Sequence, residues 1–354
     1  MKHRDFSLDL IRIIACLMVV TTHSPLPLPS ADEHSVLLAG VSLFTIPCNA
    51  MFFMVSGALL LPPPVMYASV PQCSTRAFLG KRLGKVVVPV LVWSAIYLVM
   101  LSLREHLGAA DIVRKVLSIP FAAQGCGVLW FMYTLIGLYL LTPILSAWLA
   151  GAGEKEERLY LGLWGVTLCY PLLRYVVDIN DSVTGILHNF SGCVGYFLLG
   201  HWLQHYGSKI RLWQATIGYA VAIGVPLATH LLHIDVDSSL FTCNTVSVFV
   251  LVQAVFWWTL LKTVAKCCHR LGKYQTAFAK VSALTFGIYL MHIFIMRTLL
   301  FPNPFVAALP PALQILVTVV LAFTLSLALS WLVSRTPMGG YVVGYRQRKT
   351  KKKT

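Results

Sequence analysis

Ten apolar stretches of about the length that crosses a bilayer constrain this chain more than any other feature. A helix needs about 20 mainly apolar residues to span the ~30 Å hydrocarbon core. Such stretches fall at 8–24, 41–61, 86–103, 127–149, 159–177, 187–205, 211–232, 241–261, 281–301 and 312–333. Only 12% of the 354 residues are charged and 57% are hydrophobic, which leaves too few charges to cover a soluble surface. The sequence therefore predicts an all-α polytopic integral membrane protein with about ten transmembrane helices.

The distribution of Lys and Arg predicts how these helices are oriented. If the N-terminus is cytoplasmic, most of the 28 Lys and Arg residues fall in cytoplasmic segments, as the positive-inside rule requires. We therefore expect both termini in the cytoplasm, one transmembrane domain over 1–335 and a basic cytoplasmic tail over 336–354. The tail is then a topology anchor near acidic lipid or an end with no further role. The net charge of +15 needs no nucleic acid to explain it.

The first apolar stretch is expected to remain in the protein. A cleaved signal peptide is the alternative, but Asp9 and Arg12 leave only a short apolar core after them. The residues beyond His23 are rich in proline and lack a convincing cleavage site between small residues. We therefore take this stretch as the first transmembrane helix.

Arg12 and His23 are polar residues inside this first helix, where lipid should exclude them. A central Arg costs about 2.5–3.5 kcal/mol on insertion scales, although near the cytoplasmic end it can snorkel to the interface. At about 100° per residue the two side chains share one face, about 16.5 Å apart along the axis. Asp9 lies one turn before Arg12 and is expected to pair with it. The face predicts a functional site; a His satisfied by a backbone carbonyl is the structural alternative.

Small and basic residues in the next two helices are further candidates. Ser56 and Gly57 would let another backbone or a thin ligand come close, and helix packing through small residues explains them equally well. Arg82 and Lys85 lie three residues apart and, in a helix, could converge on a phosphate. The positive-inside rule explains this basic pair without any ligand.

Aromatic and imidazole side chains mark two later helices. Trp130 opens the fourth apolar stretch and is either a residue of the interfacial aromatic belt or a platform for stacking a sugar. Tyr289 and His292 lie about one turn apart in the ninth stretch, at the expected depth of mid-membrane. A second intramembrane His is again a site candidate.

No motif predicts a metal site. Nine Cys residues are scattered singly apart from the pair Cys267–Cys268, and none has CxxC spacing. His201 and His205 have the i, i+4 spacing of a metal pair, but no obvious third ligand accompanies them. We therefore expect no metal.

Five segments together make the chain resemble the acyltransferase-3 family of bacterial membrane O-acyltransferases, which modify cell-envelope glycans. They are LDLIRIIACLMVVTTH (8–23), FFMVSGALL (52–60), KRLGKVVVP (81–89), LWFMYTLIGLYLLTP (129–143) and FGIYLMH (286–292). Each fragment alone is weak, but all five occur in the family's order over roughly residues 5–335. No soluble hydrolase-like domain follows, so the chain resembles the stand-alone members.

The resemblance implies an acyl-CoA donor, usually acetyl-CoA, and a glycan or lipid-linked sugar acceptor in the bacterial inner membrane. No permanently bound cofactor is implied. His23 would be the catalytic His and Arg12 its motif partner, while Arg82 and Lys85 would help to hold the CoA phosphates. Lys in this second place departs from the usual Arg, which keeps the charge but loses bidentate geometry. Ser56 and Gly57 would lie close to the pantetheine arm.

Two mechanisms and three rival functions remain open from the sequence. His23 would act as a general base on the acceptor hydroxyl or carry the acyl group itself. A transporter or glycan flippase would also have ten helices and intramembrane ions, and it predicts inverted repeats with broken helices at matching positions, which the sequence does not show. A non-catalytic assembly protein would need none of the polar residues. Another class of membrane O-acyltransferase would usually place its His on a late helix.

Overall fold

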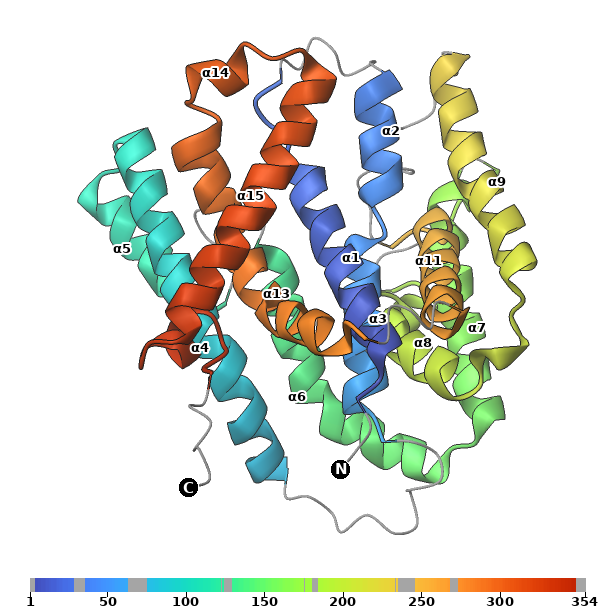
Figure 1. Cartoon of the computed structure of the whole chain (residues 1–354). Coiled ribbons are helices and arrows are strands. Elements are labelled where there is room, and N and C mark those ends of the chain that lie inside the picture. The colour runs from blue at the N-terminus through green and yellow to red at the C-terminus, as the bar shows by residue number, and fades with distance from the viewer. Residues whose placement is uncertain are drawn as a thin grey trace. The chain divides into compact units, whose positions relative to one another are not determined.

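The computed structural model is built from α-helices (Figure 1). It describes residues 4–28, 36–62, 75–121, 123, 129–174, 176–179, 184–232, 234, 246–267 and 273–347. No strand occurs among these residues, which confirms the all-α fold class. Within them, eight helices are long and apolar enough to cross a membrane, as expected of a polytopic membrane protein.

The chain forms two compact units, which are described separately. Unit 1 comprises Met1–Pro71 and Thr142–Ala279, and unit 2 comprises Gln72–Leu141 and Lys280–Thr354. The main helices of unit 1 are α1 (Phe6–His23), α2 (Val36–Thr45), α3 (Cys48–Leu60), α7 (Glu154–Leu173), α8 (Val194–His205), α9 (Leu212–Leu231) and α11 (Val248–Cys267). Those of unit 2 are α4 (Thr75–Glu105), α5 (Ala109–Ser118), α14 (Pro304–Ala307), α15 (Pro311–Ser334) and α16 (Gly339–Val342). The division between the units falls within α6 (Trp130–Gly151) and α13 (Gln275–Ile295).

Two of the ten predicted spans are not among the eight apolar helices. The stretch 159–177 corresponds to α7, whose first five residues, 154–158, are all charged. The stretch 187–205 yields only the 12 residues of α8, because a 3₁₀ turn at His188–Phe190 and Gly192, with φ of 94°, precede it. The count of about ten helices and the cytoplasmic position of both termini therefore stay predictions.

The second predicted span is a broken helix. α2 ends at Thr45 and α3 begins at Cys48, and Pro47 lies at the junction. Proline has no N–H to continue the hydrogen-bond ladder, and its ring clashes with the preceding turn. The ladder of α3 begins where the Met51 amide donates to the Pro47 carbonyl oxygen at 2.9 Å. As a result, α3 starts inside the apolar stretch, and its N-terminal dipole end lies there too.

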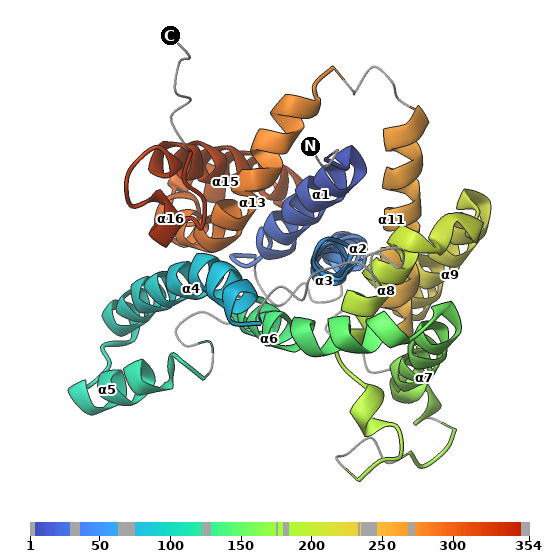
Figure 2. The ribbon, with the colours of Figure 1, turned by 90° about the horizontal axis from the view of Figure 1, so that it is seen from below.

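α3 is the central helix of unit 1. Figure 2 shows it end-on, with α1, α8 and α11 around it, and these three helices all contact it. The contact with α8 depends on two glycines: a Cβ at Gly57 would overlap the carbonyl of Phe197, and one at Gly200 would overlap the carbonyl of Met54. Small residues let the two backbones approach closely, as is common between membrane helices.

In unit 2, the segment after α15 folds back onto α4. The indole Nε1 of Trp93 donates to the Val342 carbonyl oxygen at 3.0 Å. Gly344 has φ of 65°, and a Cβ there would lie 2.9 Å from the carbonyl oxygen of Lys85. Glycine therefore suits both this backbone conformation and the close approach to α4. The first part of the predicted tail, 336–347, is therefore packed against the transmembrane part of unit 2. The remainder, 348–354, lies outside the described residues.

Candidate functional site

A network of charges holds the first residues of α1. Asp5 is the N-cap, and its carboxylate accepts hydrogen bonds from the amide and hydroxyl of Ser7. Gln204 and Lys262 also donate to this carboxylate, at 3.1 and 3.2 Å. Burial raises the pKa of Asp5, but the hydrogen bond from Ser7, the Lys262 charge and the Gln204 hydrogen bond outweigh it and lower the pKa to about 2. The N-terminal end of α1 is thus tied to α8 and α11.

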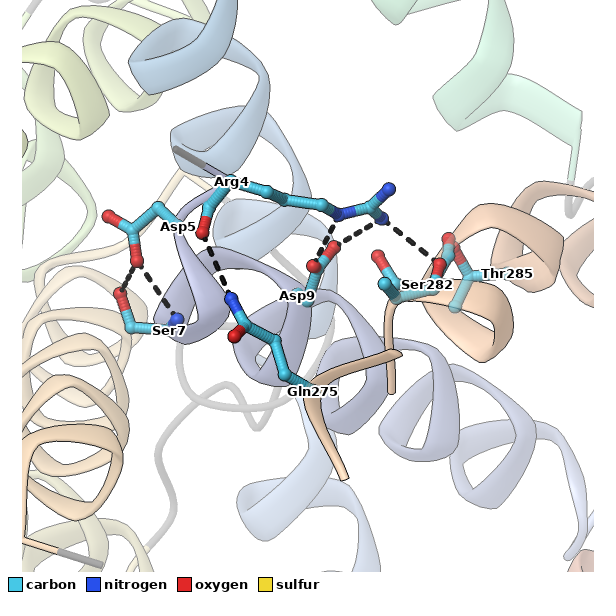
Figure 3. Close-up of polar contacts among 8 residues, drawn as sticks. Arg4, Asp5, Ser7, Asp9, Gln275, Ser282 and Thr285 are labelled. Carbon is cyan, nitrogen blue, oxygen red and sulfur yellow. Dashed lines mark hydrogen bonds and ion pairs between the residues drawn. The ribbon is translucent and has the colours of Figure 1, made fainter. Parts of the chain in front are cut away.

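A second ion pair follows one turn later. Arg4 donates from Nε and Nη2 to the two oxygens of Asp9, at 2.6 and 2.7 Å (Figure 3). Asp9 is buried, with 5% of its surface exposed. Nη2 also donates to the Ala279 carbonyl oxygen at 3.0 Å, and the Gln275 amide donates to the Arg4 carbonyl oxygen at 3.3 Å. These contacts fix the segment before α1 against the start of α13.

Arg4 is therefore a cation partner of Asp9 that the sequence did not indicate, while the expected pairing of Asp9 with Arg12 stays a prediction. The contact with Arg4 follows from the direction of helical side chains, which point back toward the N-terminus. The Asp9 carboxylate is aimed at the residues before the helix, where Arg4 supplies two parallel donors. A pairing rule that considers only residues within a helix cannot find such a partner.

Arg12 and His23 both lie on α1, which is one continuous helix from Phe6 to His23. The helical spacing on which their shared face depends is thus confirmed. Both side chains are half-buried. His23 is the last residue of the helix, and buried Ser24 follows it with its hydroxyl bonded to the Thr21 carbonyl oxygen at 2.7 Å.

The break between α2 and α3 lies beside this end of α1. The thiol of Cys48, the first residue of α3, lies near Cys16 and contacts the side chain of Thr22, the residue before His23. Both cysteines are buried. The positive end of the α3 dipole is consequently next to the last two turns of α1.

Gly57 serves the packing of α3 on α8. A Cβ at this position would overlap the Phe197 carbonyl, so the missing side chain lets the backbone of α8 come close. The packing interpretation is confirmed for this residue, and its role near a pantetheine arm stays a prediction. The hydroxyl of the half-buried Ser56 donates to the Phe52 carbonyl oxygen at 2.8 Å, and its role toward a ligand stays a prediction.

Arg82 and Lys85 both lie in α4 and are exposed. The spacing in one continuous helix places them about one turn apart. The returning segment adds a basic residue that the sequence did not indicate, because Arg346 follows two residues after Gly344, which packs on the Lys85 carbonyl. The glycines around α16, which permit this approach, were the signal that could have revealed it.

Tyr289 and His292 are buried in unit 2, at 3% and 0% exposure. The Tyr289 carbonyl oxygen lies 2.6 Å from Nδ1 of His292. A carbonyl can only accept, so Nδ1 carries the proton and Nε2 has the lone pair in the neutral ring. Phe131 packs on Tyr289 with ring centroids 5.4 Å apart, whereas its neighbour Trp130 is 40% exposed at the start of α6. Trp130 thus lies at the surface, as either of its two interpretations allows.

The predicted site residues are divided between the units. Unit 1 holds Arg12, His23, Asp9, Ser56 and Gly57. Unit 2 holds Arg82, Lys85, Trp130, Tyr289 and His292. The first group lies on α1 and α3, and the second lies on α4, α6 and α13.

A buried acid–imidazole pair was not found from the sequence. Nδ1 of His201 lies 2.8 Å from a carboxylate oxygen of Glu157, and Nε2 lies 2.9 Å from the Pro62 carbonyl oxygen. Because that carbonyl only accepts, Nε2 donates to it, and Nδ1 faces the Glu157 carboxylate. Both ring nitrogens of His201 are thus engaged within the protein. Among the described residues, no group of three or more His, Cys, Asp or Glu could hold a metal.

The family comparison agrees with the sequence resemblance. A family model described as an acyltransferase domain matches residues 5–335, nearly the whole chain. No curated protein and no solved structure is similar enough to match. The matched region includes all ten predicted site residues, from Asp9 to His292. On this match the chain belongs to the acyltransferase-3 family and is a multi-pass membrane acyltransferase.

Proposed function

We propose that the protein is an O-acyltransferase of the bacterial inner membrane. It moves an acyl group, acetyl in the simplest case, from cytoplasmic acyl-CoA to a hydroxyl of a cell-envelope glycan or lipid-linked sugar. The observation that carries the proposal is the single continuous helix α1, which holds Arg12 and His23 on one face inside the region matched by the family. Acyl-CoA is a substrate in this scheme, and no resident cofactor is needed.

His23 is the proposed catalytic base. An unperturbed imidazole titrates near neutrality, so it can take the proton of the acceptor hydroxyl as the oxygen attacks the thioester carbon. The C–S bond then breaks and CoA leaves as the thiolate. In the alternative route, His23 attacks the thioester first and carries the acyl group. Arg12, about three turns below on the same face, would meet the anionic donor.

The donor phosphates are proposed to bind to Arg82 and Lys85. Both are exposed on the N-terminal half of α4, where neighbouring cations can contact a phosphate together. Arg346 lies in the segment packed on this part of α4 and adds a third positive charge. Lys85 supplies a point charge and no bidentate fork, so we expect Arg82 to contribute more of the affinity.

Asp9 acts in this proposal through Arg4. A salt bridge with both carboxylate oxygens engaged, together with the Asp5 network, fixes the position of α1. A catalytic side chain has to stay within about 0.5 Å of its productive position. Asp9 is therefore a positioning residue, and it need not contact the substrate.

The test is acyl transfer in proteoliposomes by the His23→Ala variant. Labelled acetyl-CoA is supplied with envelope glycan, and transfer is measured beside expression level and thermal unfolding. We expect loss of transfer by at least about 100-fold, the usual contribution of a general base. His106→Ala is the matched control, since His106 is exposed after α4 and belongs to no proposed site. Full transfer by folded His23→Ala would refute the role of His23.

A second experiment identifies the acceptor of the acyl group. Envelope glycans from a deletion strain are compared with the parent by mass spectrometry, and one acyl ester should be missing. Restoration by the wild-type chain but not by His23→Ala links the ester to the activity. Identical ester content in both strains would exclude an envelope glycan as the acceptor.

Transport is the second candidate, and one observation favours it. The break between α2 and α3 resembles the discontinuous helices that form transporter sites. A transporter built from repeats should break at a matching position in its other half. Among the described residues, the other intrahelical prolines lie inside continuous helices; these are Pro89, Pro143, Pro171 and Pro226. Release of free CoA thiol with acyl transfer decides for the transferase.

A further inference from the structure

A shallow groove of about 300 Å³ lies between α13 and α15 in unit 2. Val281 and Leu284 line it from α13, and Leu327, Ala328 and Trp331 line it from α15. Lys280 and Thr324 complete the lining. The segment of α15 from 324 to 331 is about 10 Å long at the helical rise, one third of the ~30 Å hydrocarbon core. The groove therefore follows a membrane helix over most of the depth of one leaflet.

The wall of the groove offers almost no hydrogen bonds. Thr324 has the one hydroxyl of the lining, and this donor is used within its own helix, with the carbonyl oxygens of Val320 at 2.7 Å and Leu321 at 3.2 Å. Apart from Lys280 and the indole N–H of Trp331, the lining has no side-chain donor to replace the hydrogen bonds that a polar ligand would lose to water. A hydrocarbon chain suits such a wall.

The groove also contains a lysine and the indole of Trp331, which an arginine contacts. Lys280 is the one charged residue among those that line it. Trp331 is 45% exposed, and the guanidinium of Arg335 lies 3.7 Å from its ring centroid. Lys280 and Arg335 both belong to segments that the distribution of Lys and Arg predicts to be cytoplasmic. Trp beside Arg or Lys is typical of the level of the lipid headgroups.

We propose that this groove binds one anionic phospholipid of the cytoplasmic leaflet. An acyl chain lies along Val281, Leu284 and Ala328, and the phosphate is paired with Lys280 next to Trp331. The cytoplasmic leaflet carries the anionic lipids, and basic pockets between membrane helices bind their headgroups. Neither His23 nor the acyl-CoA site takes part in this binding, so it is independent of the proposed function.

The apolar wall and the charge together select a lipid over a free anion. A free phosphate can use Lys280 but gains nothing from the apolar wall. A zwitterionic lipid can use the wall but has no net charge for Lys280. Only a molecule with an acyl chain and a net negative headgroup uses both parts.

Native mass spectrometry of the purified full-length protein tests the proposal. The protein is mixed with phosphatidylglycerol and phosphatidylethanolamine of the same acyl chains, and retained lipids are counted. We expect the wild type to retain at least one phosphatidylglycerol more than phosphatidylethanolamine. Lys280→Gln should lower phosphatidylglycerol affinity about fivefold, the contribution of one Lys near a membrane surface, and leave phosphatidylethanolamine unchanged. Ala328→Trp, which fills the groove, should reduce retention of both.

Lys266→Gln is the matched control, because Lys266 is an exposed lysine at the end of α11 outside the groove. It should keep wild-type retention. Soluble glycerol phosphate should not displace the bound lipid, because it lacks the acyl chain. The proposal is overturned by equal retention of the two lipids in the wild type, by wild-type retention in Lys280→Gln, or by displacement with glycerol phosphate. Since Lys280 is exposed, its variant should fold even if Ala328→Trp does not.

Discussion

Replacing Gly57 by Ala distinguishes the two interpretations of this residue, which are helix packing and contact with a ligand. The new methyl group would overlap the Phe197 carbonyl, whereas an ordinary carbon–oxygen contact needs about 3.5 Å. α3 and α8 must therefore move apart by more than about 1 Å along their contact. Overpacking of this kind costs about 1–3 kcal/mol, and the better helix propensity of Ala returns about 0.5–1 kcal/mol.

The net loss of about 1–2 kcal/mol should lower the unfolding temperature by roughly 1–3 °C for a chain of this size. The measurement is thermal unfolding in nanodiscs, followed by tryptophan fluorescence. Gly224→Ala is the matched control, because Gly224 is in the interior of α9 and no atom lies within 4 Å of the position that its new methyl group would occupy. This variant should be as stable as the wild type or slightly more so.

A second glycine sharpens the experiment. Gly200 faces the Met54 carbonyl across the same contact, so one separation of the helices relieves both overlaps. Gly57→Ala with Gly200→Ala should then cost less than the sum of the single variants. Equal stability of Gly57→Ala and Gly224→Ala would refute the packing argument. A raised KM for acyl-CoA without loss of stability would support the ligand interpretation.

Three further changes test the polar contacts of unit 1. Arg4→Gln leaves the buried Asp9 carboxylate without its two charged hydrogen bonds and should cost about 1–3 kcal/mol in unfolding free energy, measured by denaturant titration; wild-type stability would contradict it. Asp5→Ala should remove a pH dependence of the unfolding free energy at acid pH. Because the folded pKa of Asp5 is lowered to about 2 from 3.8, the stabilisation by its carboxylate is complete above about pH 4 and is lost as pH falls toward 2. Solvent screening reduces this stabilisation to about 1 kcal/mol. Equal acid sensitivity of the variant and the wild type would refute the prediction. Glu157→Ala leaves His201 with one buried partner fewer and should cost about 2–3 kcal/mol. Lys155→Ala, at an exposed position of the same charged run, should cost less than about 0.5 kcal/mol.

The sequence predicts helices well where apolar length alone decides. The stretch 8–24 is α1 almost to the residue, and 312–333 lies within α15. It fails where a helix is interrupted: Pro47 splits the stretch 41–61, and α8 begins several residues inside 187–205. Hydropathy averages over such interruptions, because it depends on composition and not on which backbone N–H groups are free to bond.

The sequence does not predict which residues from distant parts of the chain contact one another. Gly57 meets Phe197 although about 140 residues separate them, and nothing in either segment specifies the other. Glu157 belongs to a run of five charges that is typical of a solvated loop, yet 1% of it is exposed. Its burial depends on His201, which only the packing of α7 on α8 brings near. Local patterns predict which residues are unusual in a membrane, but not what satisfies them.

The two carboxylates at the start of α1 show how such distant partners serve the proposed chemistry. Asp5 and Asp9 are negative charges at the positive N-terminal end of the α1 dipole, which stabilises them. Each also pairs with a cation from outside the helix: Asp5 with Lys262, and Asp9 with Arg4. Hydrogen bonds then run from α1 to α8, α11 and the start of α13. Rotation or sliding of α1 would break several of these at once. Because Arg12 and His23 are on the same rigid helix, the orientation of their face is set at its N-terminal end, and changes at Asp5 or Arg4 should alter acyl transfer without touching a substrate.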